Sequence, residues 1–424
     1  MPIDFRLTRN LLAVLAASAV PVVAAARPDL PEDITLYAGG DLTFQFASRI
    51  TSGGVVAGGN IAHQGNLLYA DSLMAGGGFT AQPAAFQLIS GDVLFNGDIV
   101  GFGGPGSYVG SVTSTQGSID FLDTSLTVNG DVSAQGDVEL RFSFSQFNGN
   151  VTAGGAIDIT GTVAGSIHPG TSPNLPAFSP APLPAGSMLT PGTQDITLSH
   201  FEDLTLAPGA YGTLAFANSN TVTLSSGSYV FQDITSSFNL NRLVFDTSGG
   251  AIDIYIASED FTFDMIQEVG GGSTIGANPP HAQAAHDVFL EAAGDVTLGS
   301  TFYGTVFAPH GDLTLEHAVD IVGRAYAGGD VSLFNSDVGG FFEGDVNGDG
   351  TVNAQDLDFI LAHWGQAVQY GDLDGDGLIG QADLAQVIAH WPGNALPAGS
   401  VAPEPGSAIV LLGLSVFSLR RRGR

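Results

Sequence analysis

Two acidic segments near the end of the chain hold the residues best suited to chemistry. The first reads DVNGDGTVNAQD from Asp345 to Asp356, and the second reads DLDGDGLIGQAD from Asp372 to Asp383. In both, oxygen-bearing side chains stand at positions one, three, five and twelve, and Gly stands at the sixth position, where a tightly curled loop must turn sharply. Ca²⁺ binds six to eight oxygen ligands that converge on one point. The spacing therefore predicts two calcium sites.

The candidate ligands fall at equivalent positions of the two loops, 27 residues apart. Position seven offers a main-chain carbonyl, so Thr351 and Leu378 are equally suitable there. Gly380, at position nine of the second loop, has no side chain, which predicts a water ligand and weaker binding. Clustered carboxylates repel one another without metal, so calcium is expected to be linked to folding. The candidate ligands are Asp345, Asn347, Asp349, Thr351, Asn353 and Asp356 in the first loop, and Asp372, Asp374, Asp376, Leu378 and Asp383 in the second.

Each loop leads into an apolar pattern that is typical of a short helix. The apolar side chains recur at helical spacing and predict two amphipathic helices that bury their stripes against each other. An acidic, solvated loop is the alternative interpretation, and two copies in register argue against it. The two stripes are Leu357, Ile360, Leu361 and Trp364, and, 27 residues later, Leu384, Val387, Ile388 and Trp391.

Residues 344–393 resemble a type I dockerin domain, in which each calcium loop ends in Asp, as at Asp356 and Asp383. The resemblance implies a small all-α domain with two bound Ca²⁺ ions. It also implies a cohesin-like partner that binds at the loop–helix junctions. In this chain the corresponding residues are Ala354, Gln355, Gln381 and Ala382.

The long segment before these loops is repetitive. The tripeptide AGG begins at Ala38, Ala57 and Ala75, and the later pair Asp312 and Asp330 stands 18 residues apart. Each Gly-Gly or Gly-Asp turn precedes alternating apolar and polar residues, which predicts a strand with one buried face. Recurrence at about 18 to 20 residues is typical of the coils of a β-solenoid. The Asp after each Gly is expected to bond its own backbone at the corner.

The predicted fold is mainly β, with parallel β-helix or β-solenoid modules followed by the small helical domain. The segment 168–192 is rich in Pro and is expected to be an extended linker or a loop packed on the next module. Whether the second module continues the first is left open. The predicted order is a signal peptide at 1–26, a solenoid module at 27–167, the linker at 168–192, a second solenoid module at 193–343, the calcium-binding domain at 344–393, a linker at 394–402 and a sorting segment at 403–424.

Parts of the repetitive region resemble known families. The stretches AGGNI, NGDIVG and NGDVSAQGDVEL look like the β-helix of bactofilin-type, polymer-forming proteins. The stretches LAPGAYGTL, YGTVFAPHGDLTL and GRAYAGGDVSL look like the choice-of-anchor A domain of bacterial surface proteins. Both resemblances imply a structural or adhesive role.

The two ends of the chain carry targeting patterns. Arg6 and Arg9 precede an apolar run and the small residues Ala24–Ala26, which is typical of a secretory signal peptide. A membrane anchor is the alternative. At the other end, PEP at Pro403, an apolar run and an Arg cluster resemble the PEP-CTERM sorting signal. That resemblance implies exosortase-type processing, exopolysaccharide association, and an outer-surface or matrix location with a transient or lasting membrane anchor.

The charge of the chain excludes one class of partner. From Arg27 to Leu419, five arginines face 41 acidic residues, a net charge of −36. Such a surface repels phosphate and favours cations, so nucleic-acid binding is not expected.

Three functions remain from the sequence. The first is an exported, non-catalytic surface or matrix protein with a calcium-dependent docking module. The second is a β-helix carbohydrate-active enzyme, a hydrolase or lyase that bears the dockerin. Asp pairs on a solenoid could meet the carboxylate spacing of a hydrolase, so spacing alone does not decide. The third is an ice- or glycan-binding adhesin.

Overall fold

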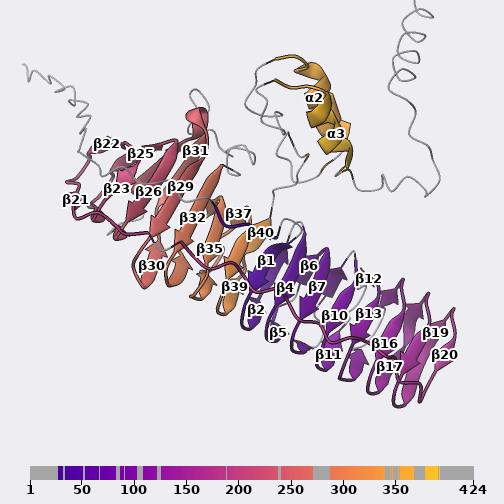
Figure 1. Ribbon diagram of the computed structural model, residues 1–424. Coiled ribbons are helices and arrows are strands. Elements are labelled where there is room, and N and C mark those ends of the chain that lie inside the picture. Colours follow the sequence, from indigo (N-terminus) through magenta and orange to yellow (C-terminus); the bar gives the residue numbers. More distant parts are fainter. Residues whose placement is uncertain are drawn as a thin grey trace, which may run out of the picture.

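The computed structural model describes residues 27–391 apart from 32–33, 51–52, 66, 83–85, 90, 103–107, 122–125, 188, 237–239, 271–286, 340–343, 345, 347–351, 353, 367–377 and 390. Its strands wind into a long parallel β-solenoid, and two short helices follow (Figure 1). The predicted fold class is confirmed. The predicted signal peptide and the 403–424 sorting segment lie outside the described residues. Within these residues no helix is long and apolar enough to cross a membrane.

The solenoid has three faces, and every described pair of neighbouring strands on a face is parallel. Face A is one 14-stranded sheet. In spatial order it contains β23 (Gly209–Ala210), β26 (Gly227–Phe231), β29 (Ile252–Ile256), β32 (Val288–Ala292), β35 (Thr305–Ala308), β38 (Ala325–Ala327), β1 (Ile34–Ala38), β4 (Gly54–Ala57), β7 (Ser72–Ala75), β10 (Val93–Phe95), β13 (Val112–Ser114), β16 (Val132–Ala134), β18 (Val151–Ala153) and β20 (Ile167–His168).

Faces B and C follow face A around each coil, and the long strands β17 (Val138–Phe147) and β19 (Ile157–Val163) bend through both. A short 3-10 helix, η1 (Thr247–Gly249), follows the face C strand β28 (Arg242–Asp246). Face B contains β21 (Ile196–Thr197), β24 (Thr213–Phe216), β27 (Asp233–Ser236), β30 (Asp260–Phe263), β33 (Asp295–Leu298), β36 (Leu313–Leu315), β39 (Val331–Phe334), β2 (Leu42–Gln45), β5 (Ile61–His63), β8 (Phe79–Ala81), β11 (Ile99–Phe102) and β14 (Ile119–Phe121); face C contains β22 (Asp203–Leu206), β25 (Thr221–Ser225), β28 (Arg242–Asp246), β31 (Ile266–Gly270), β34 (Phe302–Tyr303), β37 (Ile321–Val322), β40 (Asp337–Gly339), β3 (Ala47–Ile50), β6 (Leu67–Ala70), β9 (Phe86–Ile89), β12 (Tyr108–Val109) and β15 (Thr127–Val128).

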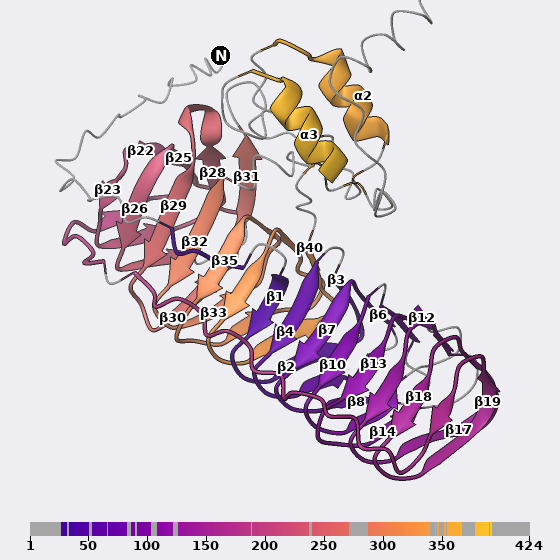
Figure 2. The same ribbon diagram turned by 45° about the vertical axis from the view of Figure 1, so that its right-hand side comes forward.

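The chain enters this solenoid in the middle. From β1 it winds outward to β20, and it resumes at the opposite end with β21 and winds back until β40 lies beside β3. Figure 2 shows the indigo and orange strands meeting at this point, which we call the seam. The two repetitive regions are therefore one continuous solenoid whose spatial order differs from its sequence order.

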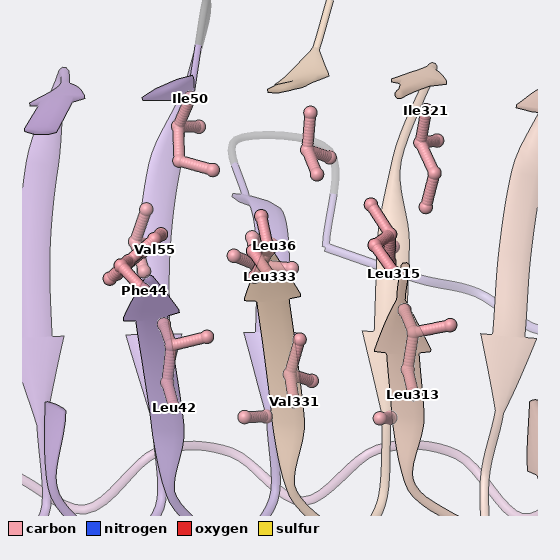
Figure 3. Packing of buried hydrophobic residues seen from close by; sticks show 14 of the residues in the cluster. Leu36, Leu42, Phe44, Ile50, Val55, Leu313, Leu315, Ile321, Val331 and Leu333 are labelled. Carbon is pink, nitrogen blue, oxygen red and sulfur yellow. The ribbon is translucent and has the colours of Figure 1, made fainter. Parts of the chain in front are cut away.

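The seam is packed like the interior of the solenoid. Phe44 and Leu333, from the two halves, stand opposite each other in register, and both are fully buried (Figure 3). The Gly39 N–H donates to the Ala327 carbonyl at 2.8 Å, and Arg49 pairs with Asp337 at 2.7 Å. The same apolar column and backbone bonding that join consecutive coils thus join two ends of the chain that are not consecutive.

The corner Asp residues tie each coil to the next. The carboxylate of Asp312 accepts the N–H of Asp330 at 2.8 Å, and that of Asp330 accepts the N–H of Asp41 across the seam at 2.7 Å. Asp41 in turn accepts from the N–H of Asn60 at 2.6 Å. The expectation that these side chains bond their own backbone was wrong. In a stack of coils the N–H of the equivalent residue in the next coil lies within reach, and the carboxylate accepts that bond instead.

The Pro-rich segment 168–192 returns along the outside of face A. Crossing 14 parallel strands requires about 62 Å at about 4.8 Å per step. Twenty-five residues supply about 78 Å in a polyproline-like conformation, whereas a helix of the same length would span only about 38 Å. The seven Pro residues of the segment thus suit this path. We call the segment 168–192 the strap. It appears as the magenta line across both halves in Figure 2.

The strap is fixed by bonds along its whole length. Asn96 bonds the backbone of Phe178 twice, at 2.6 and 2.7 Å, and the Tyr37 hydroxyl donates to the Ala181 carbonyl at 2.9 Å. Further along, the Ser187 N–H donates to Glu291. Burial under the strap raises the pKa of the Glu291 carboxyl, and the Ser187 bond partly opposes this shift. The strap joins the two halves covalently through its ends. Its hydrogen bonds to Asn96 and Tyr37 of one half and Glu291 of the other also hold the two halves together across the seam.

The first residues of the described chain cross the seam on the same face. Arg27 donates to the Asp253 carboxylate at 2.6 Å and lies over the Phe289 ring, 5.6 Å from its centre. The Tyr326 hydroxyl donates to the carbonyl of Pro31 at 2.8 Å. The N-terminal arm and the strap together cover an apolar layer outside face A, formed by Tyr37, Val56, Val230, Tyr255, Phe289, Phe307 and Tyr326.

Candidate metal centre

Two helices follow the solenoid, and each places an Asp in its first turn. Helix α2 (Ala354–Ala362) contains Asp356 and helix α3 (Gln381–Ala389) contains Asp383, at equivalent positions. A carboxylate is favoured there by the helix dipole and the free backbone N–H groups. The prediction that the last candidate ligand of each loop lies in the first turn of a helix is confirmed for both.

Both carboxylates are buried. Asp356 is 0% and Asp383 is 1% exposed, and Asp383 accepts the Gly380 N–H at 2.6 Å. The chain has no Lys, and no Arg lies between Arg324 and Arg420, so residues 344–393 contain carboxylates but no Lys or Arg. A buried carboxylate is stable when it is paired, hydrogen-bonded or bound to a cation. The two buried positions therefore fit an external cation.

Calcium suits this donor set better than a transition metal does. Eight Asp residues lie in 344–393, and the segment contains no Cys and no Glu. Hard carboxylate and carbonyl oxygens favour Ca²⁺ or Mg²⁺, and two acidic loops that each offer up to six ligands favour Ca²⁺. The structure describes Asp356, Leu378 and Asp383, while the other eight candidate ligands lie outside the described residues.

A small apolar core holds the two helices together. It joins Ile360 of α2 and Val387 of α3 with three residues from the loop segments, Val346, Val352 and Ile379. Sequence reasoning missed the loop residues. The signal was present, because Val352 and Ile379 both stand at loop position eight and repeat at the interval of 27. The loops thus contribute side chains to the core in addition to carrying the candidate calcium ligands.

The prediction that the apolar stripes of both helices are buried is only partly correct. Ile360 and Val387 are fully buried, but Leu361 is 53%, Trp364 47% and Ile388 43% exposed. Each helix has only nine residues, and the loop residues fill the space beside it, so one side chain per stripe becomes fully buried. The exposed apolar side chains remain on the surface of this unit. Phe359 of α2 packs against this small core and also against the core of the solenoid.

The comparisons with known proteins identify this unit. Residues 343–391 match the family model of the dockerin type I domain. The chain carries a type I dockerin. Dockerins of this type bind calcium and imply a cohesin partner. Comparison of the chain with curated proteins and with solved structures found no match.

Gly380 of the dockerin offers a direct test of the second calcium site. A Cβ there would have 3.8 Å to its nearest neighbour, the Asp383 carboxylate, so a side chain fits. We expect Gly380→Asn, which copies Asn353 of the first loop, to add a ligand and to raise calcium affinity at the second site about 10-fold, or about 1.4 kcal/mol. Calorimetric titration of the full chain measures this change. Gly380→Ala is the matched control, and equal affinities for the two variants would contradict the assignment of position nine.

Proposed function

We propose that this protein is an exported, non-catalytic scaffold that docks to a cohesin-like partner through its dockerin when calcium is bound. The match of 343–391 to the dockerin family carries this proposal. The eleven candidate ligands of the two loops would hold two Ca²⁺ ions. The ions would fix the loops and so present the loop–helix junctions to the partner.

The surface of the dockerin supports docking at these junctions. Ala354, Gln381 and Ala382 are exposed at the starts of α2 and α3. The exposed Leu361 stands seven residues after Ala354, and the exposed Ile388 stands seven residues after Gln381. Residues seven apart share a helix face. Helix α2 therefore carries a small junction residue, and helix α3 a polar one, on the same side as an exposed apolar residue, a surface that a partner can bury.

The solenoid supports a structural role. The corner carboxylates of Asp312, Asp330 and Asp41 accept backbone hydrogen bonds between coils, which accounts for these Asp residues without catalysis. A rigid stack of coils would hold the dockerin at a fixed distance from other modules. The signal-peptide and PEP-CTERM patterns extend the proposal to an outer-surface or matrix location, to exosortase-type processing and to association with exopolysaccharide.

Capture by immobilised type I cohesins tests the docking function. We expect the full chain to bind at least one cohesin of a panel in calcium, and to be released by chelator. Ala354→Arg combined with Ala382→Arg should weaken binding 100-fold or more, because each Arg places an unpaired charge in an interface, at about 2 kcal/mol or more apiece. Thr205→Arg, on the solenoid surface, is the control and should bind normally. Calcium-independent capture, or capture that the double variant leaves unchanged, would contradict the proposal.

A further inference from the structure

A cluster of aromatic side chains stands on the surface of the solenoid at the seam, on the corner between faces B and C. Phe334 ends β39, and Phe46 and His317 lie just after β2 and β36, the face B strands on either side of β39. The ring centres of Phe46 and Phe334 are 4.8 Å apart, and those of His317 and Phe334 are 5.4 Å apart. Phe46 is 52% exposed. Exposed apolar side chains that gather in one place, with polar residues around them, mark a binding surface.

The backbone of Phe46 carries strain that the fold does not require. Its φ of 58° lies in the left-handed region, which bulky residues rarely adopt. Asn335 stands at the equivalent corner of the adjacent coil with a φ of 56°, and Asn tolerates this conformation. The Phe46 ring is half exposed, so its burial offsets little of the strain. The corner therefore needs a left-handed residue but not a Phe, and strain of this kind gathers at functional sites.

Two rows of polar side chains run from this cluster along the outside of face B. Gln45 is in register with Phe334, and the N–H groups of Gln64 and Gln82 bond the preceding coils at 2.8 and 3.0 Å. These three Gln residues thus follow one another, one coil apart, and we call them the amide row. Beside it, a hydroxyl row that Ala62 interrupts once contains Thr314, Ser332, Thr43, Ala62 and Thr80 in register. Face B therefore offers hydrogen-bond donors and acceptors at a constant interval.

The interval between coils suits an extended sugar polymer. Neighbouring coils repeat the two rows at about 4.8 Å, and an extended β-1,4-linked pyranose chain advances by nearly this length per sugar. A peptide strand would instead repeat its side chains on one face about every 6.6 Å, out of step with the coils. The C–H groups on the face of a sugar ring favour the electron-rich face of an aromatic ring, and the sugar hydroxyls bond amides and hydroxyls.

The charge of this surface favours a neutral polymer. Glu316 continues the amide row on the far side of Phe334, and a column of corner carboxylates, among them Asp330 and Asp41, runs beside the hydroxyl row. The strands β36, β39, β2, β5 and β8 contain no Arg. A polysaccharide with a carboxylate on each sugar would therefore be repelled.

We propose that face B binds an extended, neutral, β-1,4-linked polysaccharide, which stacks one sugar on Phe46 and runs along Gln45, Gln64 and Gln82. The strap and the N-terminal arm lie on face A, so the polymer binds without a movement of either. The proposal rests on the surface or matrix role proposed above, for which it supplies a polysaccharide site, and it does not depend on cohesin docking.

Calorimetric titration of the full chain with cellohexaose, mannohexaose and xylohexaose tests the site. The titrations are made in chelator, so that calcium bridges between carboxylates contribute nothing. We expect the chain to bind at least one of these three probes and not to bind an oligogalacturonate of the same length. Phe46→Asn should weaken binding at least 10-fold. Because Asn suits a left-handed backbone, this variant should melt at or above the temperature of the unmodified chain, which separates binding from folding.

Phe201→Asn is the matched control. Phe201 is also exposed and has a left-handed φ of 61°, but it lies several coils away, just before β22. This variant should bind the sugar like the unmodified chain. Absence of binding to all three neutral probes, equal binding of the oligogalacturonate, or equal losses in Phe46→Asn and Phe201→Asn would each overturn the proposal, as would unchanged binding by Phe46→Asn. Cohesin capture should be the same for Phe46→Asn and the unmodified chain, so failure of this site and failure of docking are distinguished.

Discussion

Removal of calcium should unfold the dockerin and leave the solenoid intact. At a calcium concentration 100 times the dissociation constant, each site stabilises the folded state by about 2.7 kcal/mol, so two sites contribute about 5 kcal/mol. That is the whole stability of many small domains, and a unit of this size without disulfides has little else to stabilise it. The chain has only two Trp residues, Trp364 and Trp391, and both lie in the dockerin. Trp fluorescence of the full chain therefore reports on this unit alone.

We expect chelator to shift the Trp emission to the red while the β signal in circular dichroism stays constant. Asp383→Asn should raise the calcium concentration needed for recovery by at least 10-fold, because it removes a buried charged ligand. Asp358→Asn is the control, since Asp358 is exposed on α2 and stands outside the ligand pattern. Emission that does not respond to chelator would show that the dockerin folds without metal.

Phe44→Ala should destabilise the whole solenoid. Phe44 is fully buried at the seam, opposite Leu333 of the other half (Figure 3). Truncation of a buried Phe costs about 3–5 kcal/mol through lost apolar contacts and the cavity that remains. If the first half were a separate body, the coil of Phe44 would be terminal and partly exposed, as Ile159 is, and the loss would be smaller. Denaturant unfolding followed by circular dichroism measures the change.

Phe201→Ala is the matched control for Phe44→Ala. Phe201 is 68% exposed just before β22, at one end of the solenoid, so its truncation should change the free energy of unfolding by about 0.5 kcal/mol or less. Equal effects of the two substitutions would contradict a continuous seam.

The coil period was predictable from the sequence because each coil repeats the same local chemistry. The AGG tripeptides at Ala38, Ala57 and Ala75 stand directly in register on face A. Gly at these corners is required, since a Cβ on Gly58 would lie 2.0 Å from the Gly39 carbonyl oxygen of the neighbouring coil. A turn that recurs at a constant interval therefore identifies a stacked strand.

The spatial order of the coils was not predictable. Any coil of this protein offers an apolar column and parallel edges, so nothing in β1 distinguishes β38 as its neighbour. The path of the strap was equally hidden, because Pro content indicates an extended chain but not the surface beneath it. Asn96 and Glu291, which fix the strap, resemble other polar residues in the repeats until the structure brings them to it.

Within the candidate metal centre, the positions that local spacing determines were predictable. Asp356 and Asp383 occupy the expected first turns because the loop and helix are adjacent in sequence. The helix stripes were only partly correct, because side chains from outside the helices, such as Val352 and Ile379, also compete for the core.

The number of calcium ions bound per chain tests the central claim most directly. Equilibrium dialysis of the full chain against labelled calcium should give two ions per chain, one for each loop. Asp356→Asn or Asp383→Asn should each reduce the value to one at the same free calcium, and the double variant should bind none. A value of zero for the unmodified chain, or a value of two that the double variant retains, would contradict the assignment of the paired loops.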